Sequence, residues 1–256
     1  TDALAGAITL SNLVSGEALN HSGTATIGSA NAGSYTITNL SGISIADGSG
    51  GTASNYTLTG GTHNFTVNPK AISLSGTRLY DATTNAVASD LTTISGRVGS
   101  ETLALSGTGS VANANVGNNK TVTLGTLALG DGTGLAANYT LSGGTHQLTV
   151  NQRPLAATIA RQYDGTKTAT GSDLSAFDAL QGGETLTLSG RGTVGDENVA
   201  NGQGVTLGTL ALVNGTGLAS NYSLNTASLN ITKRVLSSSG SKTYDANTDA
   251  LAGAIT

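Results

Sequence analysis

An internal repeat constrains the fold of this chain more than any other feature of its sequence. The segment ASNYTLTGGTHNFTVN ends at Asn68, returns as AANYTLSGGTHQLTVN ending at Asn151, and returns shortened as ASNYSLNTASLNIT ending at Thr232. Self-similarity at a fixed period is the signature of a repeat architecture. The tyrosines of this segment are 83 residues apart at each step: Tyr56, Tyr139 and Tyr222. The chain is therefore expected to fold as serial modules of about 82 residues.

The shortened third copy shows where strands and turns lie. One gap, which removes the pair Gly143 and Gly144, keeps every later apolar position in register, with Leu148 aligned on Leu229. Insertions and deletions are tolerated in loops rather than in strands. The diglycine is therefore predicted to form a turn, and the residues after it a strand.

The two ends of the chain are identical over nine residues. TDALAGAIT occupies positions 1–9 and again 248–256, and joining the chain to a copy of itself continues the repeat. This pattern predicts four parts: a β-module without its first strand at 1–68, complete modules at 69–151 and 152–232, and the beginning of the next module at 233–256. The chain then reads as a piece of a longer array. The alternative is a fibre subunit whose last strand completes the first module of its neighbour, as in donor-strand assembly.

Alternating apolar and polar residues predict an all-β fold. Each module holds about six alternating segments bounded by Gly, Asp or Asn, enough strands to close a two-layer core. We therefore expect a tandem array of β-sandwich-like, immunoglobulin-like modules. Only Ser172 to Gly183 has the pattern of a short helix, and there a turn or one helical turn is expected. The alternative is a β-grasp-like module with one short helical turn.

Composition argues against several classes of function. Charged residues are 10% of the chain and the net charge is −4, without runs of one sign, so neither nucleic acid nor membrane insertion is expected. The chain has no Cys, Met or Trp, which excludes disulfides and thiol chemistry and fits proteins exported unfolded. No metal site and no cofactor is predicted, because the acidic loops carry too few carboxylates for calcium.

A Tyr-Asp pair recurs with turn chemistry after it. Asp followed two or three residues later by Thr favours an Asx turn, in which the carboxylate accepts backbone N–H bonds. The tyrosine ring is expected to pack inward and its hydroxyl to find a buried partner. We interpret these pairs, with the tyrosines of the first motif, as structural repeat positions: Tyr80, Asp81, Tyr163, Asp164, Tyr244 and Asp245, with Tyr56, Tyr139 and Tyr222.

No catalytic residue is predicted. His63 and His146 occupy matching positions, but the next module has Ala227 there. One glutamate recurs in each module, at Glu17, Glu101 and Glu184, yet a general acid needs a second group within hydrogen-bond reach and none recurs with it. Capping of the following hairpin is the role expected for these glutamates.

The motifs carry a family resemblance. QYDGTKTATG, the NVG segment at Asn115 to Gly117, and the strand around NYTL resemble, in order and spacing, the YDG-type repeats of large Gram-negative exoproteins, the filamentous-haemagglutinin-like adhesins exported by two-partner secretion. Two of the three turns read YDA instead of YDG. The resemblance implies a secreted or cell-surface stalk with no enzymatic activity, whose partners are neighbouring repeats of the same chain and, beyond them, other fibres or cell-surface and matrix glycans.

A binding function spread over the repeats is the rival interpretation. It would be weak glycan adhesion multiplied by avidity, or ice binding by threonine rows such as Thr121 and Thr123. Exposed aromatic side chains are the feature that separates glycan binding from a stalk.

Overall fold

The fold is known from a computed structural model that describes residues 2–4 and 7–249. Its regular structure is almost entirely β, which confirms the predicted fold class, and the helical segments of the described residues are 3-10 turns: η2 (Ala53–Asn55), η3 (Ala88–Asp90), η4 (Ala136–Asn138), η5 (Gly171–Asp173) and η6 (Ala219–Asn221). The chain divides into two compact units. Unit 1 comprises Thr1–Arg78, Thr84–Ala112 and Asn119–Thr149, and unit 2 comprises Leu79–Thr83, Asn113–Asn118 and Val150–Thr256.

Residues 1–68, the first repeat, form two small sheets in unit 1. The strands are β1 (Asp2–Leu4), β2 (Leu19–Thr26), β3 (Gly33–Thr36), β4 (Ile43–Asp47) and β5 (Asn64–Val67). One sheet has the order β1-β2-β4 and the other pairs β3 with β5. Four apolar side chains are buried between them: Ala25, Ile27, Ile37 and Ile43.

Residues 69–151, the second repeat, contain a four-stranded sheet of order β12-β15-β7-β9 and three short ladders, β10-β13, β11-β8 and β14-β6. The strands are β6 (Lys70–Ala71), β7 (Ser73–Leu79), β8 (Asn85–Val87), β9 (Thr93–Ser95), β10 (Leu103–Ser106), β11 (Thr108–Ser110), β12 (Gly117–Thr121), β13 (Ala128–Asp131), β14 (Tyr139–Thr140) and β15 (His146–Asn151). The diglycine is a turn, as predicted, with Gly143 at φ 82°, and β15 follows it.

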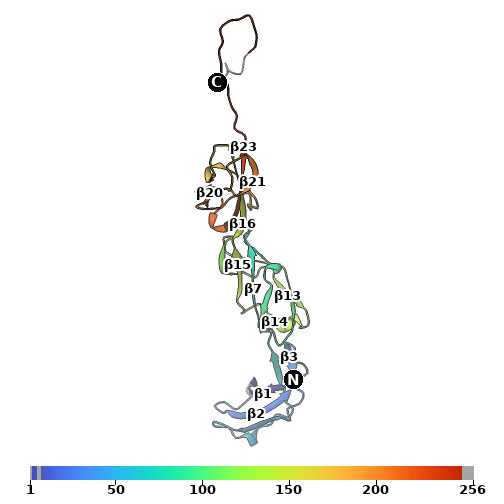
Figure 1. Ribbon diagram of the computed structural model, residues 1–256. Coiled ribbons are helices and arrows are strands. Elements are labelled where there is room, and N and C mark those ends of the chain that lie inside the picture. The colour runs from blue at the N-terminus through green and yellow to red at the C-terminus, as the bar shows by residue number, and fades with distance from the viewer. Residues whose placement is uncertain (1, 5–6, 250–256) are drawn as a thin grey trace. The chain divides into compact units, whose positions relative to one another are not determined.

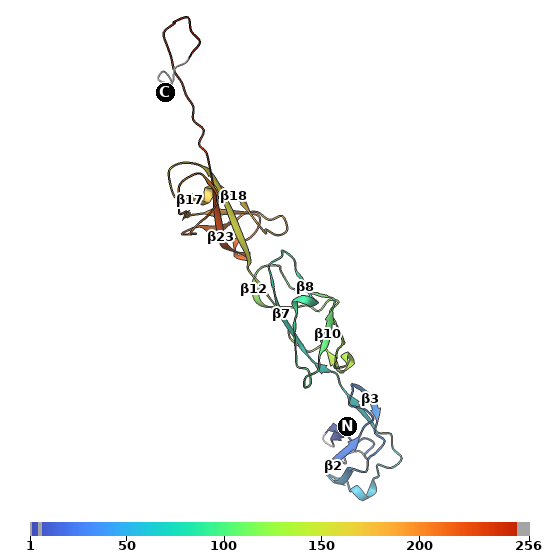
Figure 2. The same ribbon diagram turned by 45° about the vertical axis from the view of Figure 1, so that its right-hand side comes forward.

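Residues 152–232, the third repeat, have the same plan, with a sheet of order β18-β16-β23-β21 and ladders β17-β20 and β19-β22 (Figures 1 and 2). The strands are β16 (Arg153–Gln162), β17 (Thr168–Thr170), β18 (Leu174–Phe177), β19 (Leu186–Ser189), β20 (Arg191–Thr193), β21 (Ala200–Gly204), β22 (Ala211–Asn214) and β23 (Tyr222–Thr232). Without the diglycine, β23 runs for 11 residues where the second repeat has β14, a turn and β15.

The core of the third repeat lies between the four-stranded sheet and the ladders. Ile159 of β16 and Leu229 of β23 face Ala169 of β17 and Leu188 of β19 in one buried cluster. β16 runs parallel to β23, and every sheet of the described residues is built from strands of one repeat. The segment from Ser172 has one 3-10 turn, as expected, but residues 174–177 form β18, because they pair with β16 at the edge of the sheet.

Candidate functional site

A glutamate that accepts hydrogen bonds from two tyrosines is the most distinctive polar group of unit 2. The hydroxyl of Tyr222 donates to Glu184 Oε2 at 2.6 Å, and the hydroxyl of Tyr80 donates to Glu184 Oε1 at 2.5 Å. Bonds to a charged acceptor are stronger than bonds between neutral groups. Tyr80 belongs to the second repeat in sequence, and Glu184 and Tyr222 to the third, so the cluster joins two repeats within one compact unit.

Turn chemistry positions Tyr222 in this cluster. Asn214, at the end of β22, accepts the backbone N–H of Ala219 at 2.7 Å and so holds the 3-10 turn η6 in place. The strand β23 starts immediately after that turn, with Tyr222 as its first residue. The hydroxyl of Tyr222 also accepts the backbone N–H of Gln181 at 3.0 Å, which ties the tyrosine to the turn before Glu184.

Tyr80 reaches the cluster from the end of β7. Its backbone N–H donates to the Asn151 carbonyl at 2.9 Å, and its own carbonyl accepts Nε of Arg153 at 2.6 Å. The Tyr80 ring packs edge to face against Tyr222, with centroids 5.3 Å apart and planes at 78°. This geometry is one that aromatic pairs prefer. Both backbone groups and the ring of Tyr80 are therefore bound to the third repeat and the strand that leads into it.

An asparagine pair lies in the same unit. Asn221, which is buried, accepts the backbone N–H of Val116 at 3.0 Å through Oδ1, and its Nδ2 donates to Asn115 Oδ1 at 3.0 Å. Asn115 and Val116 are the first residues of the NVG segment. The two short parts of the second repeat that belong to unit 2, residues 79–83 and 113–118, are thus held by Glu184, Tyr222 and Asn221.

Unit 1 repeats the asparagine pair. Asn138 accepts the backbone N–H of Ala32 at 2.7 Å and donates to Asn31 Oδ1 at 3.0 Å. The repeat positions of Asn138 and Asn221 are the same, as are those of Asn31 and Asn115. The same two hydrogen bonds therefore join the first repeat to the second and the second to the third.

The glutamate to tyrosine bond is also repeated. The hydroxyl of Tyr139 donates to Glu101 and the hydroxyl of Tyr56 donates to Glu17, both within unit 1. The expected role of these glutamates as hairpin caps is corrected: each carboxylate binds the tyrosine of its own repeat. The signal was present in the sequence, because the separation of Glu and Tyr stays at 38 or 39 residues.

The Tyr-Asp turns have the predicted Asx geometry. Asp81 accepts the N–H of Thr83 at 2.9 Å, Asp164 that of Thr166 at 3.0 Å, and Asp245 that of Asn247 at 3.0 Å. The N–H of Thr166 is the main cause that lowers the pKa of Asp164. The middle residue is left-handed in all three turns, with φ of 61° at Ala82, 72° at Gly165 and 60° at Ala246. YDA and YDG therefore form the same turn.

The tyrosine of these turns is not a core residue of its own repeat. Tyr80 is 3% exposed, as expected of a buried ring, but Tyr163 is 37% and Tyr244 is 90% exposed, contrary to expectation. The reason is that Tyr80 is buried by Glu184 and Tyr222 of the following repeat. The described chain presents no such glutamate and tyrosine to Tyr163 or Tyr244.

The cluster consists of two phenol donors hydrogen-bonded to one carboxylate. Burial, and then the bond to Glu184, raise the pKa of both Tyr80 and Tyr222 to about 12, which keeps the two phenols neutral donors. In unit 1 the bonds to Glu101 and Glu17 raise the pKa of Tyr139 and Tyr56. Residues 2–4 and 7–249 hold no cluster of three His, Cys, Asp or Glu side chains. A membrane-spanning helix is likewise not found among them.

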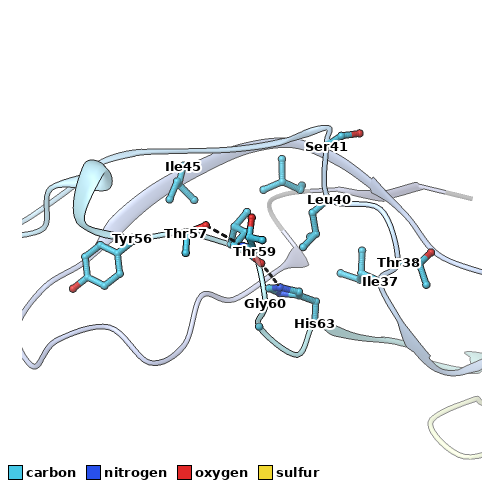
Figure 3. A pocket seen from close by; sticks show the side chains of 13 residues that line it. Ile37, Thr38, Leu40, Ser41, Ile45, Tyr56, Thr57, Thr59, Gly60 and His63 are labelled. Atoms are coloured by element: carbon cyan, nitrogen blue, oxygen red, sulfur yellow. Dashed lines mark hydrogen bonds between the residues drawn. The ribbon is translucent and has the colours of Figure 1, made fainter.

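Two open hollows lie in unit 1. One, of about 640 Å³, lies in the first repeat, and Figure 3 shows Ile37, Leu40 and His63 around it, with the imidazole bonded to the Leu58 carbonyl. The other, of about 530 Å³, lies in the second repeat beside Leu124 and its neighbours, and most of its lining corresponds by repeat position to the first. The hollows are therefore features of the repeat, and their lining offers no ion or cluster of charged side chains.

The fold and the junction define a class of tandem β-repeat proteins. A family model, the YDG domain, matches the chain twice, at residues 62–147 and 145–231. The chain therefore belongs to the YDG domain family. Comparison with curated proteins and with solved structures found no match.

Proposed function

We propose that this chain is a structural spacer in a long extracellular bacterial adhesin or matrix fibre, where serial YDG repeats carry a distal adhesive region away from the cell. One observation carries the proposal: the reciprocal asparagine bonds recur at successive repeats, as Asn31 with Asn138 and Asn115 with Asn221. In repeat proteins each unit contacts its neighbours, so stability adds along the array. A spacer needs such a serial contact, and a reaction centre does not.

The Tyr80 cluster supports the same role. It places a buried aromatic pair and a carboxylate where one repeat follows another, with one residue, Gln152, between the end of β15 and the start of β16. A force applied along the chain would have to break these bonds and the parallel pairing of β16 with β23. Secretion to the cell surface is part of the proposal and is supported by the sequence resemblance and the absence of cysteine.

Location and mechanics test the proposal. Antibodies raised against this chain should label intact cells of the source bacterium, and protease added outside should remove the label. A single chain pulled between its ends should unfold in steps of about 280 Å, the contour of an 83-residue repeat such as 69–151 at ~3.4 Å per residue. Label found only after lysis, or extension without unfolding steps, would reject the spacer.

Glycan binding is the second candidate, favoured by one observation, the exposed ring of Tyr163. Sugar sites use aromatic faces, and one ring in each repeat would bind by avidity. The burial of Tyr80 by the next repeat accounts for the same ring without a glycan. Glycan-array binding that is lost in Tyr163→Ala would favour adhesion. If the wild-type chain bound no glycan, the glycan-binding function would be rejected and the spacer function would remain.

A further inference from the structure

A bulge interrupts the edge strand β21 of the sheet in the third repeat. β21 pairs with β23 at Ala200 and again at Gln203, and the register shifts between these two residues. Asn201 and Gly202 therefore lie together opposite Asn230, and Gly202 is left-handed, with φ of 70°. Figure 1 shows β21 beside β23, and β21 is the last strand of its sheet. In a bulge the ladder of backbone hydrogen bonds is locally disrupted.

Both residues of the bulge are exposed. A Cβ built on Gly202 would meet nothing within 4 Å, and the described part of the chain provides no hydrogen bond to the Asn201 carboxamide. The N–H of Gly202 donates to Asn230 Oδ1 at 2.7 Å, that is, to a side chain and not to the ladder. The same position in the second repeat, which another repeat follows in the chain, is also exposed, at Asn118 and Asn119. Exposure is therefore a property of this repeat position.

An asparagine followed by glycine holds both reactants of a self-modification. The backbone nitrogen of Gly202 attacks Cγ of Asn201 and forms an N–Cγ bond, while the carboxamide nitrogen leaves as ammonia with the proton of the N–H. Water then opens the cyclic succinimide, and attack at Cγ gives aspartate, whereas attack at the main-chain carbonyl gives isoaspartate. The sum is asparagine plus water to aspartate plus ammonia, with no oxidant or reductant. Glycine permits the approach because it has no Cβ, and asparagine is a chemically labile residue.

The sequence contains two Asn-Gly pairs, and the surroundings of the other one, Asn214 and Gly215, oppose this reaction. Oδ1 of Asn214 accepts the N–H of Ala219 at 2.7 Å, so the side chain must break that bond to reach the backbone nitrogen. A Cβ built on Gly215 would lie 2.4 Å from the carbonyl oxygen of Thr185, so the backbone there is packed closely. The structure thus separates two pairs that are alike in sequence.

We propose that Asn201 is a site of spontaneous deamidation in the folded chain and that Asn214 is protected. The product places a carboxylate on the exposed edge strand β21 and makes the net charge one unit more negative than −4. Charged side chains on an edge strand oppose its pairing with another sheet edge. In the second repeat Asn118 is followed by Asn119, whose side chain hinders the attack that Gly202 allows. The inference goes beyond the proposed function, since it assigns a chemical modification to the chain.

Peptide mapping of the full chain tests the proposal. After incubation in mildly alkaline buffer, mass spectrometry detects deamidation as the mass difference between an oxygen atom and an NH group, and chromatography separates the aspartate and isoaspartate peptides. Because one hydrogen bond must break at Asn214, its rate should be about tenfold below that of Asn201. In urea that unfolds the chain, the two rates should become similar, because the contacts that distinguish the two pairs are then lost.

Two glycine variants on the same strand identify the reacting nitrogen. Gly202→Ala places a methyl group beside it and should slow the reaction at Asn201 to the rate of Asn214 or below. Gly204→Ala is the matched control, because Gly204 is also exposed on β21 and nothing lies within 4 Å of its Cβ position. This control should deamidate at Asn201 as fast as the wild-type chain.

A gain of reaction in the second repeat completes the test. Asn119→Gly should make Asn118 deamidate faster than it does in the wild-type chain. The proposal would be overturned by equal rates at Asn201 and Asn214 in the folded chain, or by a difference that persists in urea. An Asn201 that reacts only after unfolding, or that stops reacting in Gly204→Ala, would overturn it as well.

Discussion

The hydroxyl of Tyr80 allows the repeat junction to be tested with the removal of one atom. Tyr80→Phe deletes the donor to Glu184 Oε1 and keeps the ring that packs against Tyr222. The carboxylate retains its bond from Tyr222 at 2.6 Å, so the variant leaves no buried charge without a partner. The loss is therefore that of one charge-assisted hydrogen bond and not of the cluster.

That bond sets the expected magnitude. A hydrogen bond to a charged group contributes about 1.5–3 kcal/mol, and we expect Tyr80→Phe to lower the free energy of unfolding of unit 2 by about 2 kcal/mol. Tyr163→Phe is the matched control at the same repeat position. Its hydroxyl lies on a 37% exposed residue, so the change should stay within about 0.5 kcal/mol.

A double-mutant cycle separates the bond from other effects. Glu184→Gln keeps the shape of the side chain and removes its charge, and the cycle with Tyr80→Phe should give a coupling of about 1–2 kcal/mol. Urea unfolding followed by circular dichroism measures the free energies. Hydrogen exchange at the Gln181 amide, which donates to the Tyr222 hydroxyl, reports on the cluster itself. Additive changes in the free energy of unfolding, or an equal loss of stability in Tyr163→Phe, would refute the role of Tyr80 in linking the two repeats.

Three further predictions concern the same unit. Ala82→Gly should raise the free energy of unfolding by about 0.5–1 kcal/mol, since an L residue in a left-handed turn costs roughly 1–2 kcal/mol; an unchanged or lower urea midpoint would contradict this. Asn221→Ala should lower the free energy of unfolding by about 1–3 kcal/mol, because it leaves buried polar groups unpaired. Asn55→Ala, at the exposed counterpart in the first repeat, should cost less than about 0.5 kcal/mol. Equal costs would argue against the bond between Asn221 and Asn115 as a link between repeats. In the folded chain the pKa of Tyr80 and Tyr222 is raised to about 12 from 10.0, so their contribution to stability is complete below pH 10 and is lost as the pH rises to 12. Thermal melts between pH 10 and 12 should show a falling melting temperature. The fall should be smaller in Tyr80→Phe.

Local chemistry predicted the repeat and most of its strands, but not β18, whose residues were expected in a turn. Alternation of apolar and polar residues is a property of the strand itself, and the deletion of Gly143 and Gly144 marked a turn because loops tolerate length changes. The Asx turn at Asp81 was also predictable, since its carboxylate bonds to a backbone group two residues away. Each of these features is decided by residues that are close in sequence.

The sequence also contained signals that local reasoning could not interpret. The glutamate and the tyrosine recur 38 or 39 residues apart, but separation along the chain does not say that a hydroxyl and a carboxylate meet. Asn221 stands in an NYS motif that resembles a glycan acceptor, and its burial against Asn115 is a property of packing between repeats. Recurrence showed that these residues matter to every repeat without showing what they bind.

Only the tertiary structure decided which copy of a repeated residue is buried. Tyr80 and Tyr163 follow equivalent strands and precede the same Asx turn, so their sequences predict one environment for both. Their exposures differ because the partner of this tyrosine belongs to the next repeat, about a hundred residues along the chain, and Glu184 is present for Tyr80. The sequence by itself determined the module, most of its strands and its turns, because those depend on neighbours along the chain. The contact between repeats depends on which repeats lie next to each other in space.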